Sequence, residues 1–258
     1  MASYSYQQGF HLFRGRNINA PTSGAGRPDP GAGNVVQLES TARSSSHVLN
    51  LTLNSGANRR LSWMVSYSLS KKINEADGPL SLPADNLDLR AERGTAGDDM
   101  RHRLTITTGL GLFKGWRLTP TFFYSSPRPY NITTGRDDNS DTVFNDRPPN
   151  ALRNGARSAT FWNVNMRLSW LFGFGKTDDT GKAGPRTVRV QAGDYGAIAS
   201  ELGAMEKKWR FNFYLQATNL FNHFNPTNFV GVMTSPFFGR PTAAAPARQI
   251  ETGVKFSF

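Results

Sequence analysis

The sequence predicts an all-β chain, an antiparallel transmembrane β-barrel segment of about eight strands. Apolar and polar residues alternate along successive segments, which places the apolar ones on one face of each strand. The connections between these segments alternate between long and short, as they do in outer-membrane barrels. No segment approaches the roughly 18 uninterrupted apolar residues of a membrane-spanning helix. A chain of this kind would cross a membrane with strands.

The clearest alternation lies at the C-terminal end. One predicted strand face carries Ile250, Thr252, Val254, Phe256 and Phe258, and the residues between them are polar, charged or glycine. The same rule holds in seven earlier segments, with more interruptions toward the N-terminus: 4–12, 49–53, 61–69, 104–112, 116–124, 162–172 and 209–217. Most of these segments should have about the 9–11 residues that a tilted membrane strand needs.

The connections support this assignment independently. Counted back from a periplasmic C-terminus, the outside loops are 14–34, 73–99, 127–157 and 221–247, all long and rich in Gly, Pro, Asn and Asp. Two inside turns, 55–58 and 114–115, are tight. The third inside connection, 174–207, is long and contains a candidate short helix from Ala197 to Lys207, so we interpret it as a periplasmic insertion.

Alternation also predicts which face each side chain occupies. Six residues should point outward to lipid: Leu168, Trp170, Phe211, Phe213, Val254 and Phe256. Four should lie on the concave face: Arg167, Arg210, Gln249 and Lys255. A register slip of one residue would invert all of these assignments.

The composition fits a single sheet between lipid and water. Hydrophobic residues make up 38% of the chain and aromatics 12%, whereas soluble globular chains have about 45–50% apolar residues. The five tryptophans mostly fall near predicted strand ends, where amphipathic rings favour the membrane interface. They are Trp63, Trp116, Trp162, Trp170 and Trp209. The alternative is that they are core residues of a soluble β-protein.

The chain is strongly basic, with a formal net charge of +11. Such a balance often indicates nucleic-acid binding. Here the arginines are scattered, and no Lys/Arg run of five or more occurs. We therefore expect no nucleic-acid partner. Arginines that face a lumen or the anionic lipid of the outer membrane explain the charge equally well.

No constellation for catalysis or for a cofactor is visible in the sequence. Cysteine is absent, which excludes disulfides, zinc–thiolate sites and cysteine catalysis. The serines lie in no G-x-S-x-G context, and Gly109-Leu110-Gly111 belongs to a predicted strand. Four histidines lack metal-ligand spacing, and we interpret them as rim or lumen residues: His11, His47, His102 and His223. We expect no enzyme and no cofactor.

The acidic segment Asp137-Asp138-Asn139-Ser140-Asp141 is the one candidate metal site, because alternating oxygen ligands suit calcium. An EF-hand loop would need Gly at position 142 and Glu at 148, which are Thr142 and Pro148. With Asp146 nearby, another kind of calcium loop stays open. The simpler interpretation is a solvated loop whose Asp and Asn side chains form turns.

Several segments resemble one family, the Oar-like TonB-dependent receptors. The ending Ala247–Phe258 resembles the last strand of their barrel, and Ala217–His223 resembles the penultimate strand with its "NLFN" tip. Three loops are similar as well: Ser235–Arg240 ("SPxFGR"), Asn145–Pro148 and Arg16–Pro21. Each motif alone is weak. As an ordered set they are specific, and they cover nearly the whole chain but only the end of a barrel.

The resemblance implies a 22-stranded barrel with an N-terminal plug, of which residues 1–258 would be the C-terminal part, without plug or TonB box. The full receptor would take up a bulky, unidentified nutrient, driven through the missing N-terminal part by the TonB system. Val254, Phe256 and Phe258 would be the signal that the barrel assembly machinery reads. The start, Met1–Tyr6, has no signal-peptide pattern, so we expect the natural chain to begin upstream.

Two other classes stay open. The chain could be a complete small eight-stranded outer-membrane barrel with an adhesive or structural role. It could also be a soluble β binding module, in which the apolar residues would face a shared core.

Overall fold

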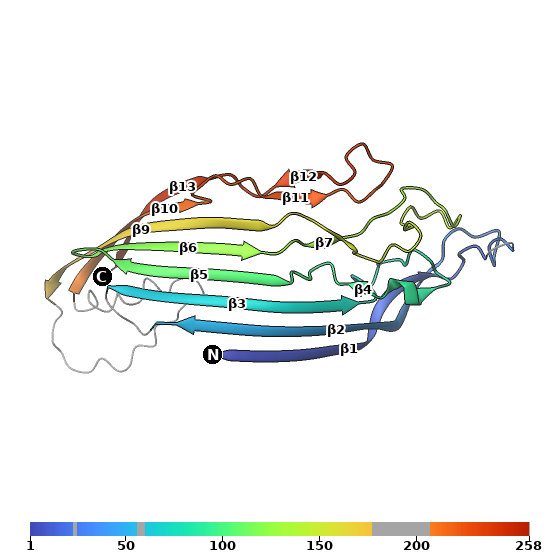
Figure 1. Ribbon diagram of the computed structural model, residues 1–258, viewed down its shortest axis with the longest axis horizontal. Helices are drawn as coiled ribbons and strands as arrows, with labels where there is room; N and C mark the ends of the chain where they lie inside the picture. The colour runs from blue at the N-terminus through green and yellow to red at the C-terminus, as the bar shows by residue number, and fades with distance from the viewer. Residues whose placement is uncertain (23–24, 56–59, 177–206, 258) are drawn as a thin grey trace.

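In the computed structural model, which describes residues 1–22, 25–55, 60–176 and 207–257, the chain is one curved antiparallel sheet with two short hairpins (Figure 1). The main strands are β1 (Ala2–Asn17), β2 (Val36–Asn54), β3 (Leu61–Asn74), β5 (His102–Gly111), β6 (Trp116–Ser125), β9 (Phe161–Lys176), β10 (Lys207–Thr218) and β13 (Gln249–Ser257). They are hydrogen-bonded in the order β1-β2-β3-β5-β6-β9-β10-β13, and β4 (Gly94–Thr95) adds to β3. The predicted series of consecutive antiparallel hairpins is confirmed.

Helical structure within the described residues is limited to the 3-10 turn η1 (Leu89–Glu92), and no helix there is long and apolar enough to cross a membrane.

Several strands are longer than predicted. β5, β6 and β13 have 10, 10 and 9 residues, but β1, β2 and β9 have 16, 19 and 16. The β1–β2 ladder passes an irregularity at Gly9–Phe13 and continues to the pair Asn17–Val36. Alternation is needed only where one face meets lipid, so the polar continuation of these strands carried no signal in the sequence.

The short connections lie together at one end of the sheet. The predicted turn at Lys114-Gly115 is confirmed: both residues have positive φ, 33° and 85°, and the Trp116 amide donates to the Phe113 carbonyl at 2.8 Å. Of the predicted turn 55–58, residues 56–58 lie outside the described residues, and the Ser55 amide donates to the Trp63 carbonyl at 2.9 Å.

The predicted bounds of the insertion, 174–207, were wrong at both ends. β9 continues to Lys176 and β10 begins at Lys207, so both ends of the segment belong to strands. Lys207 therefore does not end a helix. Residues 177–206, with the rest of that candidate helix, lie outside the part of the chain that the structure describes.

All four long connections lie at the opposite end of the sheet, as the predicted alternation requires (Figure 1). They contain short elements that the sequence did not reveal: η1, the hairpin β7 (Pro129–Tyr130) with β8 (Ala156–Arg157), and the hairpin β11 (Pro226–Phe229) with β12 (Pro241–Ala244). We call this the outer end of the sheet.

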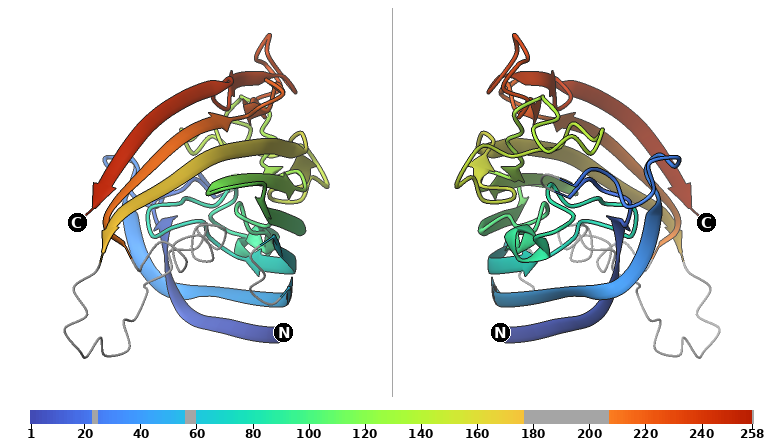
Figure 2. Two further views of the ribbon diagram at one scale, coloured as in Figure 1. Left: turned by 90° about the vertical axis from the view of Figure 1, so that its left-hand side faces the viewer. Right: turned by 90° about the vertical axis from the view of Figure 1, so that its right-hand side faces the viewer.

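The sheet forms a curved wall whose two edges stay apart. Figure 2 shows the curvature, with several of the long connections on the concave side. β1 and β13 are the ends of the strand order, and no described residue of β1 pairs with β13. The described residues therefore form part of a barrel wall and do not close a barrel.

Candidate functional site: the two faces of the sheet and the outer connections

The register brings the predicted apolar residues together on one face. Phe213 lies opposite Val254 on β13 and Trp170 on β9, and Phe211 lies opposite Phe256. The rings pack against one another across the strands, with centroid distances of 4.7 Å for Phe211–Phe256, 5.6 Å for Trp170–Phe213 and 5.8 Å for Trp116–Trp170. Such cross-strand aromatic pairs stabilise a sheet locally.

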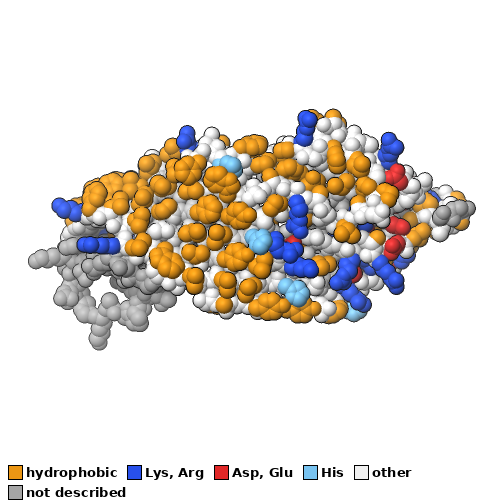
Figure 3. Space-filling view, viewed as in Figure 1, with side chains coloured by type: hydrophobic (Ala, Val, Ile, Leu, Met, Phe, Trp, Pro, Cys, Tyr) orange, Lys and Arg blue, Asp and Glu red, His pale blue; other side chains and the backbone are white. Residues whose placement is uncertain are grey.

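This apolar face is the convex one. The space-filling view shows hydrophobic side chains over most of the face that bulges outward in Figure 2 (Figure 3). Its large side chains are open to the surroundings, with Phe213 exposed by 40%, Phe256 by 45% and Val254 by 60%. The predicted outward orientation of these residues agrees with the structure.

The interior is not hydrophobic. Among the described residues the buried hydrophobic ones are four alanines, at positions 20, 42, 84 and 96. A soluble β-protein would bury its large apolar side chains in a shared core, whereas here they lie outside and polar groups lie inside. The soluble binding module therefore finds no support in the structure.

The concave face is polar, as predicted for a water-filled lumen. Arg117 is only 3% exposed, and its Nη2 donates to the Ser62 hydroxyl at 2.6 Å. The Arg167 guanidinium lies 4.2 Å from the centroid of the Tyr214 ring, and the Tyr214 hydroxyl donates to Glu251 at 2.9 Å. The register places Arg210, Gln249 and Lys255 on this same face.

The tryptophans follow the two borders of the apolar surface. Trp63, Trp116 and Trp209 lie near the first residues of β3, β6 and β10, away from the outer connections, whereas Trp162 lies at the outer end of β9. Trp170 lies further along β9 and stacks on Trp116 at an interplanar angle of 13°. This distribution fits rings that anchor a barrel at both interfaces of a membrane.

Three of the four histidines are paired with aromatic residues. The Tyr4 hydroxyl lies 2.8 Å from His47 Nδ1, the Tyr67 hydroxyl lies 2.8 Å from His102 Nδ1, and His223 stacks on Trp162 with ring centroids 4.0 Å apart. The register places His47 and His102 on the convex face, so of the two positions expected for them, rim or lumen, the lumen is excluded. His11 lies apart, at the irregularity in β1, with a φ of 55°.

The structure brings no metal-ligating cluster together in the ranges that it describes, since no group of three or more His, Cys, Asp or Glu there could hold a metal ion.

Two outer connections are joined by ion pairs, of which the one between Arg147 and Glu92 is buried. The Arg147 Nη2 lies 2.6 Å from Glu92 Oε1, and the two side chains are only 8% and 6% exposed. Arg153 donates to the Glu92 carbonyl at 3.1 Å and to the Asn74 carbonyl at 2.9 Å, and it pairs with Asp77 at 2.7 Å. These contacts hold the connection that follows β3 against the one that follows β6.

The pKa of Asp77 is set by these neighbours. Its partial burial raises the pKa, but the hydrogen bonds from Asn74 and Arg153 and the Arg153 charge together lower the pKa by more, so the net shift is downward. Asp77 is therefore held as a carboxylate by the residues around it.

The acidic loop uses its oxygens for turns. The two Asp137 oxygens accept the amides of Asp141 and Thr142, both at 2.9 Å. The Asp146 carboxylate accepts the Asp138 amide at 2.9 Å. Burial raises the pKa of Asp146; the Asp138 amide lowers it, and the charges of Asp141, Asp138 and Asp137 raise it, so the net shift is upward. The geometry supports the simpler interpretation as an Asp-stabilised turn.

The residues expected to form the assembly signal are only partly visible. Phe256 stacks on Trp209 with ring centroids 5.6 Å apart, and Val254 points outward. Phe258 lies outside the described residues.

Comparison with known proteins agrees with this geometry. A family model described as an outer membrane beta barrel domain matches residues 1–251. A solved structure, the outer membrane transporter YddB from Escherichia coli, superposes with a TM-score of 0.57 over 98% of this chain at 10% sequence identity, which shows a shared fold. The chain spans 29% of the YddB chain. No curated protein sequence matches. The chain belongs to the outer membrane beta barrel domain family, and its location is the outer membrane.

Proposed function

We propose that this chain is the C-terminal part of the barrel of a TonB-dependent receptor of the Oar-like kind, which takes up a bulky nutrient across the outer membrane. The observation that carries the proposal is the open sheet of consecutive strands. It matches a large transporter over 98% of its own length and only 29% of the transporter's.

The two free edges favour a larger barrel over a complete eight-stranded one. In the hydrocarbon region an unpaired backbone amide or carbonyl costs several kcal/mol. The edge strands β1 and β13 have 16 and 9 residues, and neither pairs with the other in the described part of the chain. Further strands between these edges, supplied by an upstream part of the barrel, would satisfy those groups.

The polar interior and the joined outer connections suit a receptor that binds and passes a ligand. The lumen face carries charged and amide side chains, and the outer connections form a layer held by the buried Arg147–Glu92 pair and the part-exposed Arg153–Asp77 pair. Ligand choice would lie in these connections and in the plug. We propose no catalytic role. The partners in this proposal are the barrel assembly machinery, outer-membrane lipid and the TonB system, which would act through an N-terminal part.

The size of the native protein tests the proposal first. An antibody raised against the exposed segment 232–240 should detect, in isolated outer membranes, a heat-modifiable band much larger than the 28.5 kDa of residues 1–258. A folded band at 28.5 kDa would instead support the complete small barrel.

A second experiment tests the proposed coupling to the TonB system. In cells with cysteines introduced into TonB and into the N-terminal region of the large form, disulfide cross-links between the two should form. Their absence, with the large form folded and inserted, would refute coupling to TonB without affecting the assignment to a large barrel.

A further inference from the structure

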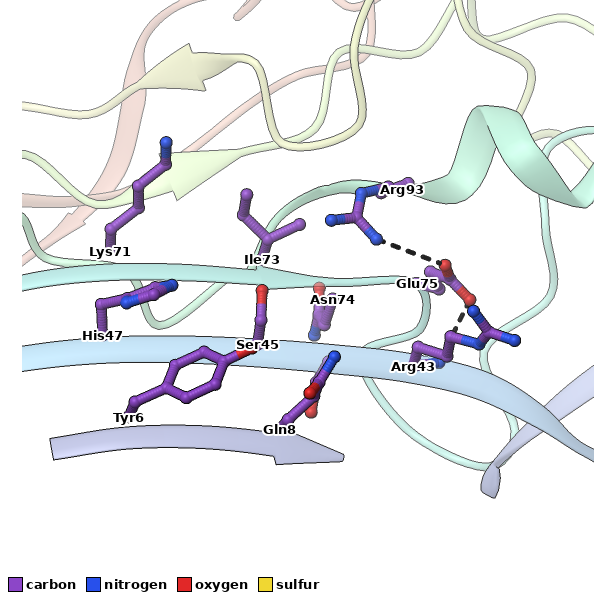
Figure 4. Close-up of a pocket in the computed structure, with 11 residues that line it drawn as sticks. Tyr6, Gln8, Arg43, Ser45, His47, Lys71, Ile73, Asn74, Glu75 and Arg93 are labelled. Carbon is purple, nitrogen blue, oxygen red and sulfur yellow. Dashed lines mark hydrogen bonds and ion pairs between the residues drawn. The ribbon is translucent and has the colours of Figure 1, made fainter. Parts of the chain in front are cut away.

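A cavity of about 290 Å³ opens on the convex face of β1, β2 and β3, near the outer end of the sheet (Figure 4). Tyr6, His47 and Lys71 lie on its side toward the apolar surface, and Arg43 and Arg93 on its side toward the outer connections. The register confirms the common face, because Tyr6 lies opposite His47, and His47 lies opposite Lys71. This hollow therefore lies where the membrane-facing surface meets the outer connections.

The charges around the cavity are unbalanced. Arg43, Lys71 and Arg93 face one carboxylate, Glu75, which leaves an excess of two positive charges. Glu75 Oε1 lies 3.9 Å from the Arg93 guanidinium, and its Oε2 accepts the Arg43 backbone amide at 3.1 Å. The Arg43 guanidinium and the Lys71 ammonium have no hydrogen-bond or ion-pair partner among the residues that the structure describes.

Neutral polar groups lie between the cations. Gln8 and Ser45 line the cavity between Lys71 on one side and Arg43 on the other (Figure 4). Amide and hydroxyl side chains in this position can bond the hydroxyl groups of a sugar, and the flanking cations can bond phosphate oxygens. The Tyr6 and His47 rings, with centroids 4.6 Å apart, form a border of the kind that lies at the level of lipid headgroups.

From these observations we infer that the cavity binds the phosphorylated sugar headgroup of an outer-leaflet glycolipid, whose acyl chains then lie on the apolar surface below it. The long connections mark this end of the sheet as extracellular, so the lipid that reaches the cavity comes from the outer leaflet. A phosphate monoester carries a charge of about −1.5 to −2 at neutral pH, which matches the excess of two positive charges. The inference requires only the outer-membrane location, and it does not depend on coupling to TonB.

The test uses the full-length protein purified in a neutral detergent. Native mass spectrometry would measure binding of bisphosphorylated lipid A, of the same lipid after enzymatic dephosphorylation, and of its deacylated, water-soluble headgroup. We expect the bisphosphorylated lipid to bind most tightly, the dephosphorylated lipid to bind at least tenfold more weakly, and the soluble headgroup to bind weakly, because both phosphate and acyl chains contribute. Equal binding of the two lipids would overturn the inference. Equal binding of lipid and soluble headgroup would show a site for free phosphosugars and would overturn the lipid assignment.

A charge-neutral variant locates the site. In Arg43→Gln with Lys71→Gln, two exposed side chains lose their charge while the Arg43 backbone contact to Glu75 is kept. We expect affinity for the bisphosphorylated lipid to fall roughly tenfold or more, since both surface cations attract anionic lipid. The control, Lys114→Gln with Arg136→Gln, removes the same charge at exposed positions away from the cavity. Heat-modifiable migration would show that both variants are folded. An equal loss of lipid affinity in both double variants would overturn the assignment of the site to this cavity. No loss of affinity in the Arg43→Gln/Lys71→Gln variant would overturn it as well.

Discussion

Arg147 and Glu92 form an almost fully buried ion pair, 2.6 Å between Nη2 and Oε1, that joins two outer connections separated by β5 and β6. Glu92 also accepts the Ala84 amide at 2.9 Å, and Arg153 lies 3.8 Å from its second oxygen. One carboxylate therefore holds two guanidinium groups and a backbone amide in the outer layer.

Glu92→Gln should loosen this layer. It leaves the buried Arg147 guanidinium without a carboxylate, and breaking a buried pair costs about 3–5 kcal/mol. We expect amide hydrogen exchange within 127–157 to accelerate by on the order of a hundredfold, while the strands keep their protection. Asp98→Asn is the matched control, because its side chain is 65% exposed and pairs with Lys72 at the surface. Equal exchange in Glu92→Gln and the parent would refute the structural role of the pair.

Adjacent residues on β5 test the assignment of the two faces. Ile106 lies opposite Val65 and Phe122 on the lipid side, and Thr105 lies opposite Ser66 and Phe123. Ile106→Arg should destabilise the inserted protein by about 2–4 kcal/mol, the cost of arginine at the bilayer midplane. Thr105→Arg, which places the same charge on the lumen side, should cost much less. Urea unfolding in lipid vesicles would measure both, and the reverse ranking would invert the two faces.

Removing the charge of Asp146 should stabilise the acidic loop at neutral pH. Its folded-state pKa is raised above the usual aspartate pKa of 3.8. A raised pKa means that the favourable contribution of this group is fully present below pH 3.8 and is lost as the pH rises through the folded pKa. Asp146→Asn imitates the protonated form and can still accept the Asp138 amide. We expect slower amide exchange than in the parent at pH 7, and no difference below pH 3.8. Faster exchange at pH 7 would contradict this.

Asp77 should behave in the opposite way. Its pKa is lowered, so its contribution to stability is present above the usual aspartate pKa of 3.8 and is lost as the pH falls through the folded pKa. Acidification should therefore weaken the Asp77–Arg153 pair and speed exchange near Asn74. In Asp77→Asn this acid dependence should be reduced, and an unchanged acid profile would assign it to another group.

If the chain is part of the proposed receptor, Phe258→Ala should lower the amount of that protein in the outer membrane and leave ligand affinity per inserted molecule unchanged. The reason is the resemblance of this strand to the assembly signal, in which Phe258 would present an aromatic ring to the assembly machinery. The amount of inserted protein is measured as the heat-modifiable band in purified outer membranes. Ligand binding to the same membranes measures the affinity per inserted molecule. Ser257→Ala is a neighbouring control on the other strand face. Normal insertion of Phe258→Ala would remove the targeting role.

The strands were predictable because lipid imposes a strict rule on one face. Phe211, Phe213 and Val254 had to be apolar at every second position, and that period fixed both the strands and their sides. A strand segment that does not face lipid need not alternate between apolar and polar residues. The sequence therefore did not predict the polar part of β2 before Leu49. The contacts in the outer connections, such as Arg147 with Glu92, join residues far apart in sequence, and no local pattern announces them.

The cavity beside Lys71 could not be predicted from the sequence for a related reason. The spacing of Arg43, Lys71 and Arg93 suggests scattered charge, and only the pairing of β2 with β3 and the path of the following connection bring them to one hollow. The histidines illustrate the same limit. Their positions excluded metal spacing, but the hydroxyl partners Tyr4 and Tyr67 follow from the register alone.

Strictly sequential pairing also bears on how such a wall could change in evolution. Each main strand bonds only to its neighbours in chain order, so loss of the β5–β6 hairpin would leave β3 facing β9 in the same antiparallel sense without rethreading the chain. The two connections that would then fuse are already joined through Arg153 and Asp77. Circumference can thus shrink or grow by whole hairpins, two strands at a time, which provides a simple route to barrels of different even strand number.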